Sequence, residues 1–477
     1  MKYDTVIGLE IHLELQTRSK LFCGCSTTFG QEPNINCCPI CLGLPGSLPV
    51  FNRRAIELAV SVALALNSVV QQKSRFDRKN YFYPDLPKGY QISQYDQPLA
   101  RGGYLEIEFD EESRRINLER VHLEEEAGKL MHAGDSIFDS SYSLVDYNRA
   151  GIALLEIVTK PDIHSGREAR LFLEDLRTLL LYTGASDCKM EEGSLRCDAN
   201  ISLRPVGSTA LGTKVEVKNM NSFRAVEMAL NYEVKRQEEI LSADGHIIQE
   251  TCHWDEEKKE TIPLRGKEGS SDYRYFPEPD LLPLILEASF IEKQSALLPE
   301  LPRQRRMRFK EHYGLNGKGA ALLTENRTLG DFFEAAAKEY SDYRNLVKWI
   351  QGDLLYQLRE SGKSVEQIEP GLLVELITLL DNGNITRPVA KELLAEMVLS
   401  GKSPYKLVQE KGLERISGQE KLLPLVDRAI AENPEAVENY RRGKEKAIAF
   451  LVGRVMVLSG GRADPEELNK LIKGKIS

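Results

Sequence analysis

The sequence predicts an α+β protein in which a mixed β-sheet domain comes first and helical domains follow it. Up to about residue 290, short strand-like segments are separated by long irregular connections, without regular strand–helix–strand repeats. Beyond the proline-rich segment Phe276–Asp280, apolar residues recur at helical spacing instead. These two patterns favour a mixed sheet over a doubly wound parallel one.

The length of 477 residues is too great for one compact core, and roughly 150 residues per domain suggests about three domains. With 42% hydrophobic and 28% charged residues, the composition is that of a folded protein. No run approaches the roughly 18 apolar residues that span a bilayer, and Met1–Asp4 leads into a strand pattern, not a signal peptide. We therefore expect a cytoplasmic protein.

The predicted strands alternate apolar and polar residues. They are Ile7–Leu15, Ile116–Leu123, Leu154–Val158, Leu195–Leu203 and Lys214–Val217. Helical spacing predicts helices over Leu329–Glu339, Asn345–Arg359 and Pro388–Leu399, and capping residues predict two more that begin at Pro434 and Pro465. We expect a sheet domain over residues 1–293, a helical middle domain over 294–407 and a helical tail domain over 408–477.

The first strand places Glu10 and His12 side by side on its polar face, because strand side chains alternate with a period of two. On an isolated strand such a face is most often merely exposed to solvent. Two further strands repeat the pattern with anion- and cation-binding residue types, which favours a shared site. Their polar residues are Arg196, Asp198, Asn200 and Ser202 in one strand, and Lys214, Glu216 and Lys218 in the other.

Carboxylates provide the strongest sign of a cation site. Glu156 lies within the apolar run Leu154–Val158, where a buried carboxylate needs a cationic partner. Glu124–Glu126 places three carboxylates in a row, which a bound cation would stabilise, although a solvated charge run is the commoner explanation. Carboxylates with an occasional imidazole suit Mg²⁺ and the phosphates of ATP. The sequence has neither a Walker-type loop nor a GxGxxG turn, so residue types alone indicate ATP.

The segment Arg75–Asp85 combines cations with aromatic residues. Such a mixture can contact phosphates and stack on bases, and core packing explains its aromatic residues equally well.

Five of the eight cysteines lie between Cys23 and Cys41, which points to a metal site. Two pairs, Cys23 with Cys25 and Cys38 with Cys41, have twelve residues between them, as in a small tetrahedral zinc site. Four thiolates leave no open coordination position, so a structural role is expected. Cys37 leaves the choice of ligands open, and the remaining cysteines are expected in the core: Cys188, Cys197 and Cys252.

The tail from Asn433 to Ser477 has nine Lys and Arg against six Asp and Glu, whereas the whole chain has a net charge of −9. This asymmetry suggests contact with nucleic acid, and an ordinary solvated helix face is the alternative. The candidate phosphate-binding residues are Arg441, Arg442, Lys444, Lys446, Arg454 and Arg462.

Several motifs together resemble the B subunits of tRNA-dependent aspartyl/glutamyl amidotransferases. They are Val6–His12, Cys38–Gly46, Phe76–Asp85, Tyr90–Gln94, Met190–Asn200 and Asp272–Asp280. The resemblance continues through Asn433–Val437 and Phe450–Gly453, and so covers essentially the whole chain. Two departures from the family pattern are the extra Cys37 and the segment Thr251–Asp255.

The resemblance implies a carbon–nitrogen ligase that uses glutamine as the amide donor. ATP would phosphorylate the side-chain carboxylate of glutamate on misacylated tRNA(Gln), or of aspartate on tRNA(Asn), and ammonia would displace the phosphate. It also implies that the sheet domain is the catalytic domain, related in fold to glutamine synthetase, with the cysteine segment 23–41 as an insertion. Which tRNA is the substrate stays open.

The resemblance also implies roles for individual residues. The implied Mg²⁺ ligands are His12, Glu125 and Glu156, with Glu10 and Glu124 in or near the same cluster. The implied nucleotide- or intermediate-binding residues are Arg196, Asp198, Asn200 and Lys218. Lys79 is a candidate contact for phosphate or the transferred amino acid.

Ammonia has to come from a partner, because the chain has neither an amidase Ser-Ser-Lys constellation in recognisable context nor a Cys-His glutaminase motif. The resemblance implies a heterotrimer with an amidase A subunit and a small C subunit, in which the helical domains cradle the tRNA. Two other functions remain open at this level. One is a zinc hydrolase that combines Cys23, Cys25 or Cys41 with His12, and the other is a non-catalytic tRNA-binding scaffold.

Overall fold

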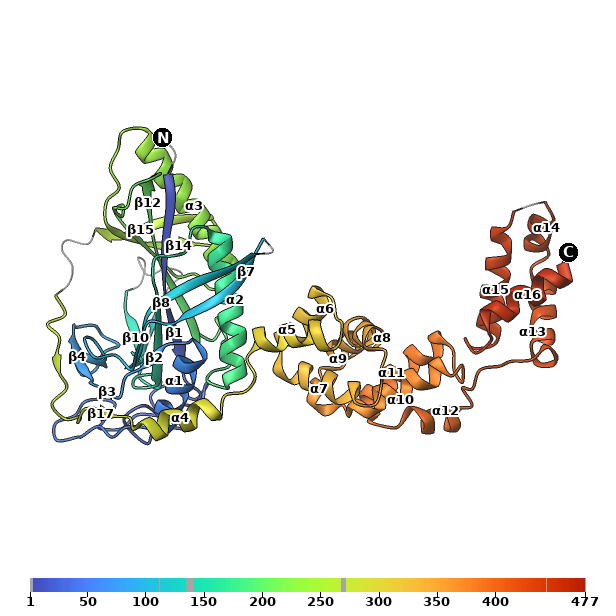
Figure 1. The fold of residues 1–477 in the computed structure, drawn as a ribbon, viewed down its shortest axis with the longest axis horizontal. Coiled ribbons are helices and arrows are strands. Elements are labelled where there is room, and N and C mark those ends of the chain that lie inside the picture. The colour runs from blue at the N-terminus through green and yellow to red at the C-terminus, as the bar shows by residue number, and fades with distance from the viewer. Residues whose placement is uncertain (1–2, 111, 134–140, 267–271, 443, 477) are drawn as a thin grey trace. The chain divides into compact units, whose positions relative to one another are not determined.

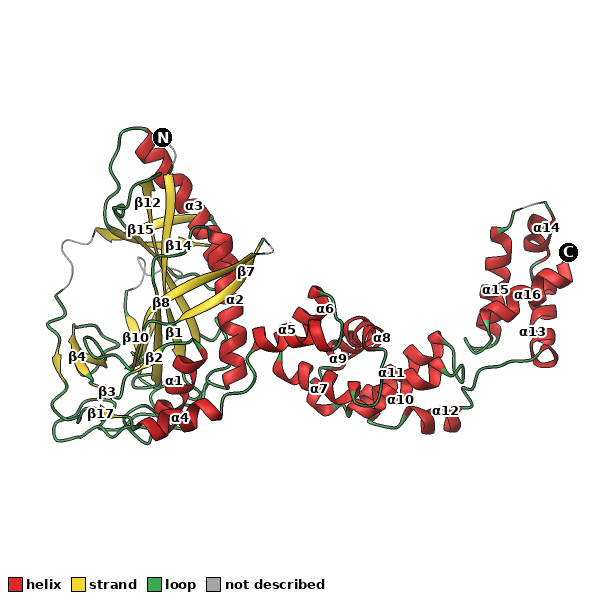
Figure 2. Ribbon diagram, viewed as in Figure 1, coloured by secondary structure: helices red, strands yellow, loops and turns green. Residues whose placement is uncertain are grey.

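The computed structural model describes residues 3–110, 112–133, 141–266, 272–442 and 444–476, which form two compact units (Figure 1). These units, Met1–Leu301 and Pro302–Ser477, are described separately. All the named strands belong to the first unit, and the described part of the second unit is helical (Figure 2). The structure therefore confirms the expected succession of a sheet-containing part and a helical part.

A ten-stranded sheet forms the centre of the first unit, in the order β15-β14-β13-β12-β1-β11-β8-β6-β2, with β7 paired to β8. Its five central strands are β1 (Tyr3–Glu14), β8 (Glu112–Glu125), β11 (Ala153–Thr159), β12 (Leu195–Pro205) and β13 (Val215–Lys218). Each includes most of a strand predicted from the sequence. The outer strands are β2 (Val69–Val70), β6 (Ala100–Arg101), β7 (Tyr104–Phe109), β14 (Glu250–Asp255) and β15 (Glu260–Gly266). Among the described strands of this sheet, only β13 and β14 pair in parallel, so the sheet is mixed.

Apolar residues on one face of the sheet form the main core with the helices that cover them. Leu9, Ile11 and Leu13 of β1 are completely buried there. The covering helices are α1 (Arg53–Ala65), α2 (Gly166–Thr183) and α3 (Phe223–Ser242), and Figure 1 shows α2 and α3 along one side of the sheet. The local sequence defines the ends of α2. Ser165 accepts a hydrogen bond from the Glu168 amide at its start, and Gly184 takes a left-handed conformation at its end.

Three small sheets and one helix complete the first unit. The small sheets are β4 (Asp77–Asn80) with β5 (Tyr90–Ser93) and β16 (Phe276–Pro277), β3 (Lys73–Ser74) with β17 (Leu284–Ile285), and β9 (Lys129–His132) with β10 (Ser143–Asp146). The helix is α4 (Ala288–Ala296). Because β16 pairs with β4, the end of this unit lies beside a segment about two hundred residues earlier in the sequence.

The second unit has two separate hydrophobic cores. The first core is formed by α5 (Pro302–His312), α6 (Gly317–Glu325), α7 (Arg327–Ala337), α8 (Tyr343–Lys348), η1 (Trp349–Leu354), α9 (Leu355–Ser361), η2 (Val365–Gln367), α10 (Pro370–Asp381), α11 (Arg387–Ser400) and α12 (Pro404–Lys411). The second is formed by α13 (Gln419–Glu432), α14 (Pro434–Arg441), α15 (Lys446–Leu458) and α16 (Pro465–Ile476). The predicted helix starts at Pro434 and Pro465 are confirmed.

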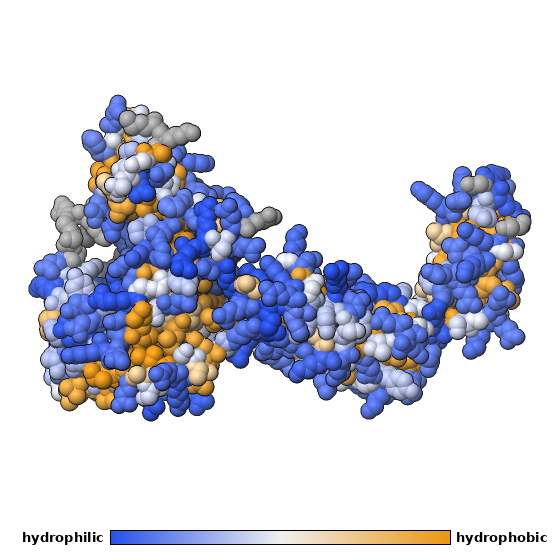
Figure 3. Space-filling view, in the orientation of Figure 1, coloured by the Kyte–Doolittle hydropathy of each residue, from blue (hydrophilic) through white to orange (hydrophobic). Residues whose placement is uncertain are grey.

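The predicted helix over Asn345–Arg359 is interrupted by the π-helical segment η1, which the residue pattern did not reveal. Hydrophilic residues dominate the visible surface of the helical unit (Figure 3). None of the described helices is long and apolar enough to cross a membrane.

The small second core predicts a local stability test on α15. Leu451 is completely buried, whereas Val457 on the same helix is 71% exposed. We expect Leu451→Ala to destabilise the last four helices by about 2–5 kcal/mol, because it leaves a cavity in their core. The matched Val457→Ala change is expected to shift stability by less than about 0.5 kcal/mol. Urea denaturation of Pro302–Ser477, followed by circular dichroism, measures both, and equal effects would contradict this core.

Candidate active site

The register of four neighbouring strands places a row of polar side chains across the sheet. His122 lies opposite Glu156, Glu156 lies opposite His12, and His12 lies opposite Arg196. Directly opposite residues share a face of the sheet, so these four side chains lie on the face away from the main core. The polar faces predicted separately for the strands are therefore one continuous surface.

The neighbouring row continues this surface into β13. Glu10 lies opposite Asp198, and its Oε1 accepts a hydrogen bond of 3.0 Å from Asn200 Nδ2. Lys218 Nζ donates to Asp198 Oδ2 at 2.5 Å and lies 3.1 Å from Glu216 Oε1. The structure thus brings the predicted nucleotide-binding residues beside Glu10 and His12.

Three side chains form a group that could hold a metal ion. His12 Nε2 lies 3.7 Å from Glu124 Oε1 and 3.6 Å from Glu156 Oε2, and one ligand atom from each lies within 4.8 Å of the others. Both carboxylates are buried, and Ser93 Oγ fixes Glu124 with a hydrogen bond of 3.1 Å to its Oε2. Two carboxylates and an imidazole, which leave room for water and phosphate oxygens, fit Mg²⁺.

Glu125 does not belong to this group, in contrast to the ligand set His12, Glu125 and Glu156 inferred above. Its Oε1 accepts a hydrogen bond of 2.8 Å from the Ile92 amide and another from Lys88 Nζ. The physical reason is strand alternation, which turns neighbouring residues of β8 to opposite faces. Glu124 takes the position beside His12 instead.

His122 is a member of the row that sequence reasoning missed. It is buried, and its Nε2 lies 3.2 Å from Glu156 Oε2 and 3.8 Å from Glu124 Oε2. Burial lowers the pKa of His122, but the two carboxylates outweigh burial and raise that pKa to about 9. His122, and Arg120 at 3.8 Å, are therefore candidates for the cationic partner predicted for Glu156. Side chains two residues apart on a strand share a face, so the position two residues before Glu124 could have been recognised from the sequence.

Glu126 holds Arg196 in place at the end of the row. Its Oε2 accepts hydrogen bonds from Arg196 Nη2 and, at 3.2 Å, from Arg149 Nη2, which also donates to Glu14 Oε1 at 2.7 Å. Burial raises the pKa of Glu126, but the two guanidinium groups outweigh it and lower that pKa below its usual value. Sequence reasoning missed Arg149, because it lies in a loop and has no strand periodicity to mark it.

Lys79 lies on β4, outside the strands that form the row. Its Nζ is 4.9 Å from the ring centroid of Tyr273 and 5.9 Å from that of Tyr81. No residue in the described part of the chain forms an ion pair with it. The structure therefore places Lys79 in an aromatic environment, and it stays a candidate contact for an anionic substrate.

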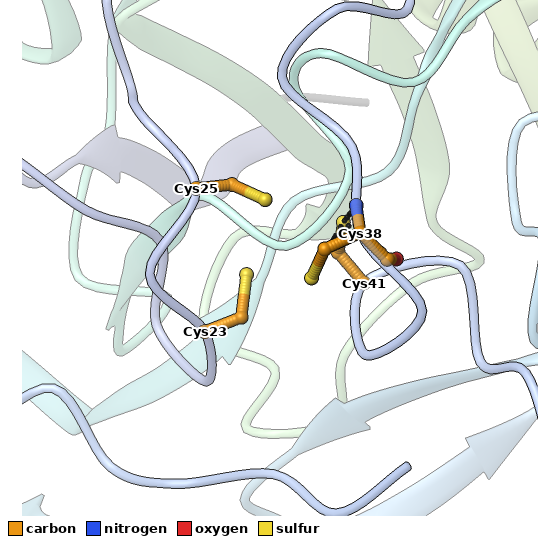
Figure 4. Close-up of side chains that lie close together, drawn as sticks. All are labelled: Cys23, Cys25, Cys38 and Cys41. Atoms are coloured by element: carbon orange, nitrogen blue, oxygen red, sulfur yellow. Dashed lines mark hydrogen bonds between the residues drawn. The ribbon is translucent and has the colours of Figure 1, made fainter.

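The four cysteines Cys23, Cys25, Cys38 and Cys41 point towards one another from two loop segments (Figure 4). Their sulfur atoms lie within 4.8 Å of one another, and Cys37 is not part of this group. A hydrogen bond from Cys23, which outweighs the effect of burial, lowers the pKa of Cys41 to about 4. Four clustered sulfur ligands fit a structural zinc ion.

The remaining three cysteines lie apart from the four-cysteine cluster. Cys188, Cys197 and Cys252 belong to the main core, as expected. Among the described residues, His12 groups with carboxylates and not with cysteines. The zinc hydrolase that would combine them therefore finds no support in the structure.

Two protein-family models match the chain. The GatB/GatE catalytic domain covers residues 5–292, and the GatB domain covers residues 331–476. The chain belongs to the GatB family. A protein of Carboxydothermus hydrogenoformans is 52% identical over all of this chain and 99% of its own length, and one of Moorella thermoacetica is 52% identical over the whole of both chains. Another, from Thermodesulfovibrio yellowstonii, is 49% identical over 99% of each chain.

All three relatives are named as the B subunit of an aspartyl/glutamyl-tRNA(Asn/Gln) amidotransferase. The resemblance recognised from the motif residues is therefore confirmed.

The candidate tRNA-binding cations lie within the region that the GatB domain covers, on or near α14 and α15. Several are already engaged within the chain. Arg442 Nη2 donates to Glu438 at 2.5 Å, Arg454 lies 3.9 Å from Glu432, Lys444 Nζ donates to Asn439 at 3.1 Å, and Arg441 Nε donates to the Ile476 carbonyl at 3.2 Å. Contact of these residues with tRNA stays a prediction.

The cysteine cluster predicts that substitutions at two adjacent cysteines differ in their effect on zinc content. We expect the purified protein to contain about one zinc ion per chain, Cys38→Ser to lose it, and Cys37→Ser to retain it. The two cysteines are adjacent in sequence, but only Cys38 belongs to the cluster. Metal analysis of the dialysed variants measures the difference. Loss of zinc from both variants, or from neither, would contradict the four-cysteine site.

Proposed function

We propose that this chain catalyses the ATP-dependent amidation of glutamate on tRNA(Gln), or of aspartate on tRNA(Asn). The side-chain carboxylate attacks the γ-phosphate of ATP, which releases ADP and forms an acyl phosphate. Ammonia then attacks the acyl carbon, phosphate leaves, and the products are Gln-tRNA(Gln) or Asn-tRNA(Asn). The row of buried carboxylates and cations in a GatB-family chain is the observation that carries this proposal.

The chemistry explains why such a site is useful. A carboxylate is a poor electrophile, because its oxygen leaves poorly, whereas phosphorylation converts that oxygen into a good leaving group. Bound Mg²⁺ would neutralise charge on the phosphoryl group during its transfer. Positioning and charge neutralisation supply most of the catalysis in phosphoryl transfer, and prearranged side chains provide both.

The residues of the polar surface divide into three roles in this proposal. His12, Glu124 and Glu156 would hold Mg²⁺, and His122 would keep the Glu156 carboxylate in position. Arg196, oriented by Glu126, contacts a phosphate or the carboxylate that receives it. Glu10, Asp198, Asn200 and Lys218 form a second hydrogen-bonded group that orients the nucleotide.

The chain obtains ammonia from a partner in this proposal. The relatives are named as B subunits, which supports an assembly with other subunits. We propose an amidase A subunit that releases ammonia from glutamine and a small C subunit. We also propose a glutamine-synthetase-like catalytic domain at residues 1–293 and tRNA-binding helical domains at 294–407 and 408–477.

One experiment tests the reaction and identifies the substrate. The assembled complex receives ammonia and ATP with either Glu-tRNA(Gln) or Asp-tRNA(Asn), and the amino acid on the product tRNA is identified. We expect ADP release that depends on the misacylated tRNA, together with glutamine or asparagine on the product. Amidation without ATP consumption would contradict the proposal, and a pure scaffold would show neither.

Adjacent glutamates give a sharper test of the metal site. We expect Glu124→Gln to lower ADP release by about 10- to 100-fold at low Mg²⁺, because it removes a charged ligand, and higher Mg²⁺ to restore part of the loss. Glu125→Gln is the matched control, since its carboxylate faces Lys88. It should leave the Mg²⁺ concentration for half-maximal ADP release unchanged. A shifted Mg²⁺ dependence in Glu125→Gln but not in Glu124→Gln would restore the ligand set inferred from the sequence.

A further inference from the structure

Four tyrosines gather beside the polar row from three segments of the chain. Tyr95 and Tyr275 are stacked, with ring centroids 4.1 Å apart and an angle of 8° between the rings. Tyr273 meets Tyr275 edge to face at 6.0 Å, and Tyr81 meets Tyr273 in the same way at 5.9 Å. The catalytic role proposed above uses none of them.

The stacked pair lies close to the proposed metal group. Tyr95 follows β5, whose Ser93 donates a hydrogen bond to Glu124. Burial, together with the negative charges of Glu124 and Glu156, raises the pKa of Tyr275. The charges of Glu124 and Glu156 therefore act on the stacked pair, which places it near the metal group.

The segment that carries Tyr273 and Tyr275 is fixed at both ends. Glu278, which is buried, forms two hydrogen bonds with the Arg78 guanidinium, at 2.7 and 2.8 Å. At the other end, the backbone amide of Asn80 donates a hydrogen bond of 2.9 Å to the Tyr273 carbonyl. The side-chain amide of Asn80 donates one of 2.8 Å to the Arg274 carbonyl. The two tyrosines are thus part of a rigid wall.

Backbone strain marks the same segment. Arg274 has a φ angle of +44°, in the left-handed region that a residue with a side chain rarely adopts. Its amide donates to Asp272 Oδ1 at 3.0 Å, which helps to stabilise this conformation. Strained residues of this kind concentrate at ligand sites, where the surrounding structure offsets their cost.

One side of the stack is open to solvent, and the wall behind it carries two cations. Tyr95 is 59% exposed although Tyr275 covers one of its faces, so its other face is accessible. Arg274 is exposed, and neither Arg274 nor Lys79 has an ion-pair partner in the described part of the chain. Lys79 Nζ packs against the Tyr273 ring, and Arg274 lies between Tyr273 and Tyr275 in the chain, so both cations belong to the same aromatic wall. An aromatic wall that also carries cations suits a base with phosphate groups.

We propose that the open face of Tyr95 stacks on an adenine ring and that Lys79 and Arg274 contact the phosphates attached to it. This proposal rests on the proposed function, which brings two adenosines to the site: that of ATP and the terminal adenosine of the aminoacylated tRNA. Both present the same ring chemistry. The strained wall keeps Tyr275 behind Tyr95, so that the platform exists before the adenosine arrives.

Substitution of Tyr95 in the assembled complex tests this proposal. Removing a stacking ring weakens binding by about five- to 160-fold, so Tyr95→Ala should raise by this factor the KM of the substrate whose adenine stacks there. Tyr95→Phe keeps the ring and should keep a KM within about twofold of the original value. Titration of ATP at saturating tRNA, and of tRNA at saturating ATP, shows which adenosine is bound.

Tyr104→Ala is the matched control. Tyr104 lies opposite Asn117 and contacts Arg115, and Asn117 precedes Glu124 by seven residues on β8, which at about 3.3 Å per residue separates them by about 20 Å along the strand. Neither KM should change in this variant. If both values stay unchanged in Tyr95→Ala, or if Tyr95→Phe is as impaired as Tyr95→Ala, the proposal is wrong.

Equilibrium binding of ATP and of tRNA to the same variants separates this proposal from the proposed reaction. If Tyr95→Ala binds ATP or tRNA more weakly, and Tyr95→Phe and Tyr104→Ala do not, the platform is supported. This holds even if the wild-type protein releases no ADP, a result that would reject the proposed reaction. Normal turnover by the original protein with unchanged binding by Tyr95→Ala would reject the platform only.

Discussion

The antiparallel register of β1 with its two neighbours fixes the geometry of the site. It places His12 opposite both Glu156 and Arg196, and it joins polar faces from segments nearly two hundred residues apart. A shift of one residue would turn His12 into the core and Ile11 to the polar face. The completely buried residues of β1 prevent such a shift, because their apolar surface would be exposed to water. Core packing and site geometry therefore have the same origin.

Charge balance makes this polar surface stable in a partly buried position. Glu156 faces His12 and His122, and Glu126 faces Arg149 and Arg196. Each of these buried carboxylates thus has at least one cation near it, which offsets the cost of removing it from water. The same arrangement holds the groups in fixed positions, so little reorganisation is needed when a phosphate or a metal ion binds.

The cysteine cluster is connected through Lys20 to a loop at the edge of this surface. Lys20 is completely buried; its Nζ lies 3.6 Å from Cys41 Sγ and donates to the Tyr147 carbonyl at 3.2 Å. Two residues after Tyr147 comes Arg149, which contacts Glu126. A zinc ion bound by the four cysteines would therefore support the loop that brings a guanidinium group to the end of the row, without taking part in the reaction.

Local spacing and motifs were enough to predict the strands, their polar and apolar faces, the paired cysteines and the family. The alternation around Glu10 and His12 and the two residues between Cys38 and Cys41 are visible within single segments, and the family motifs can be compared along the chain. The residue pattern also indicated that Glu156 needs a cation, because a carboxylate in an apolar strand is otherwise too costly.

Which side chains meet could be learned only from the folded chain. The structure selected Glu124 over Glu125 for the group with His12, because the direction of a side chain in a strand depends on pairing with distant strands. It added His122 and the loop residue Arg149, whose partners are far away in sequence. It also stacked Tyr95 on Tyr275, which are brought together when β16 pairs with β4. Spacing along one segment reveals its faces, whereas contacts between segments follow from register and packing.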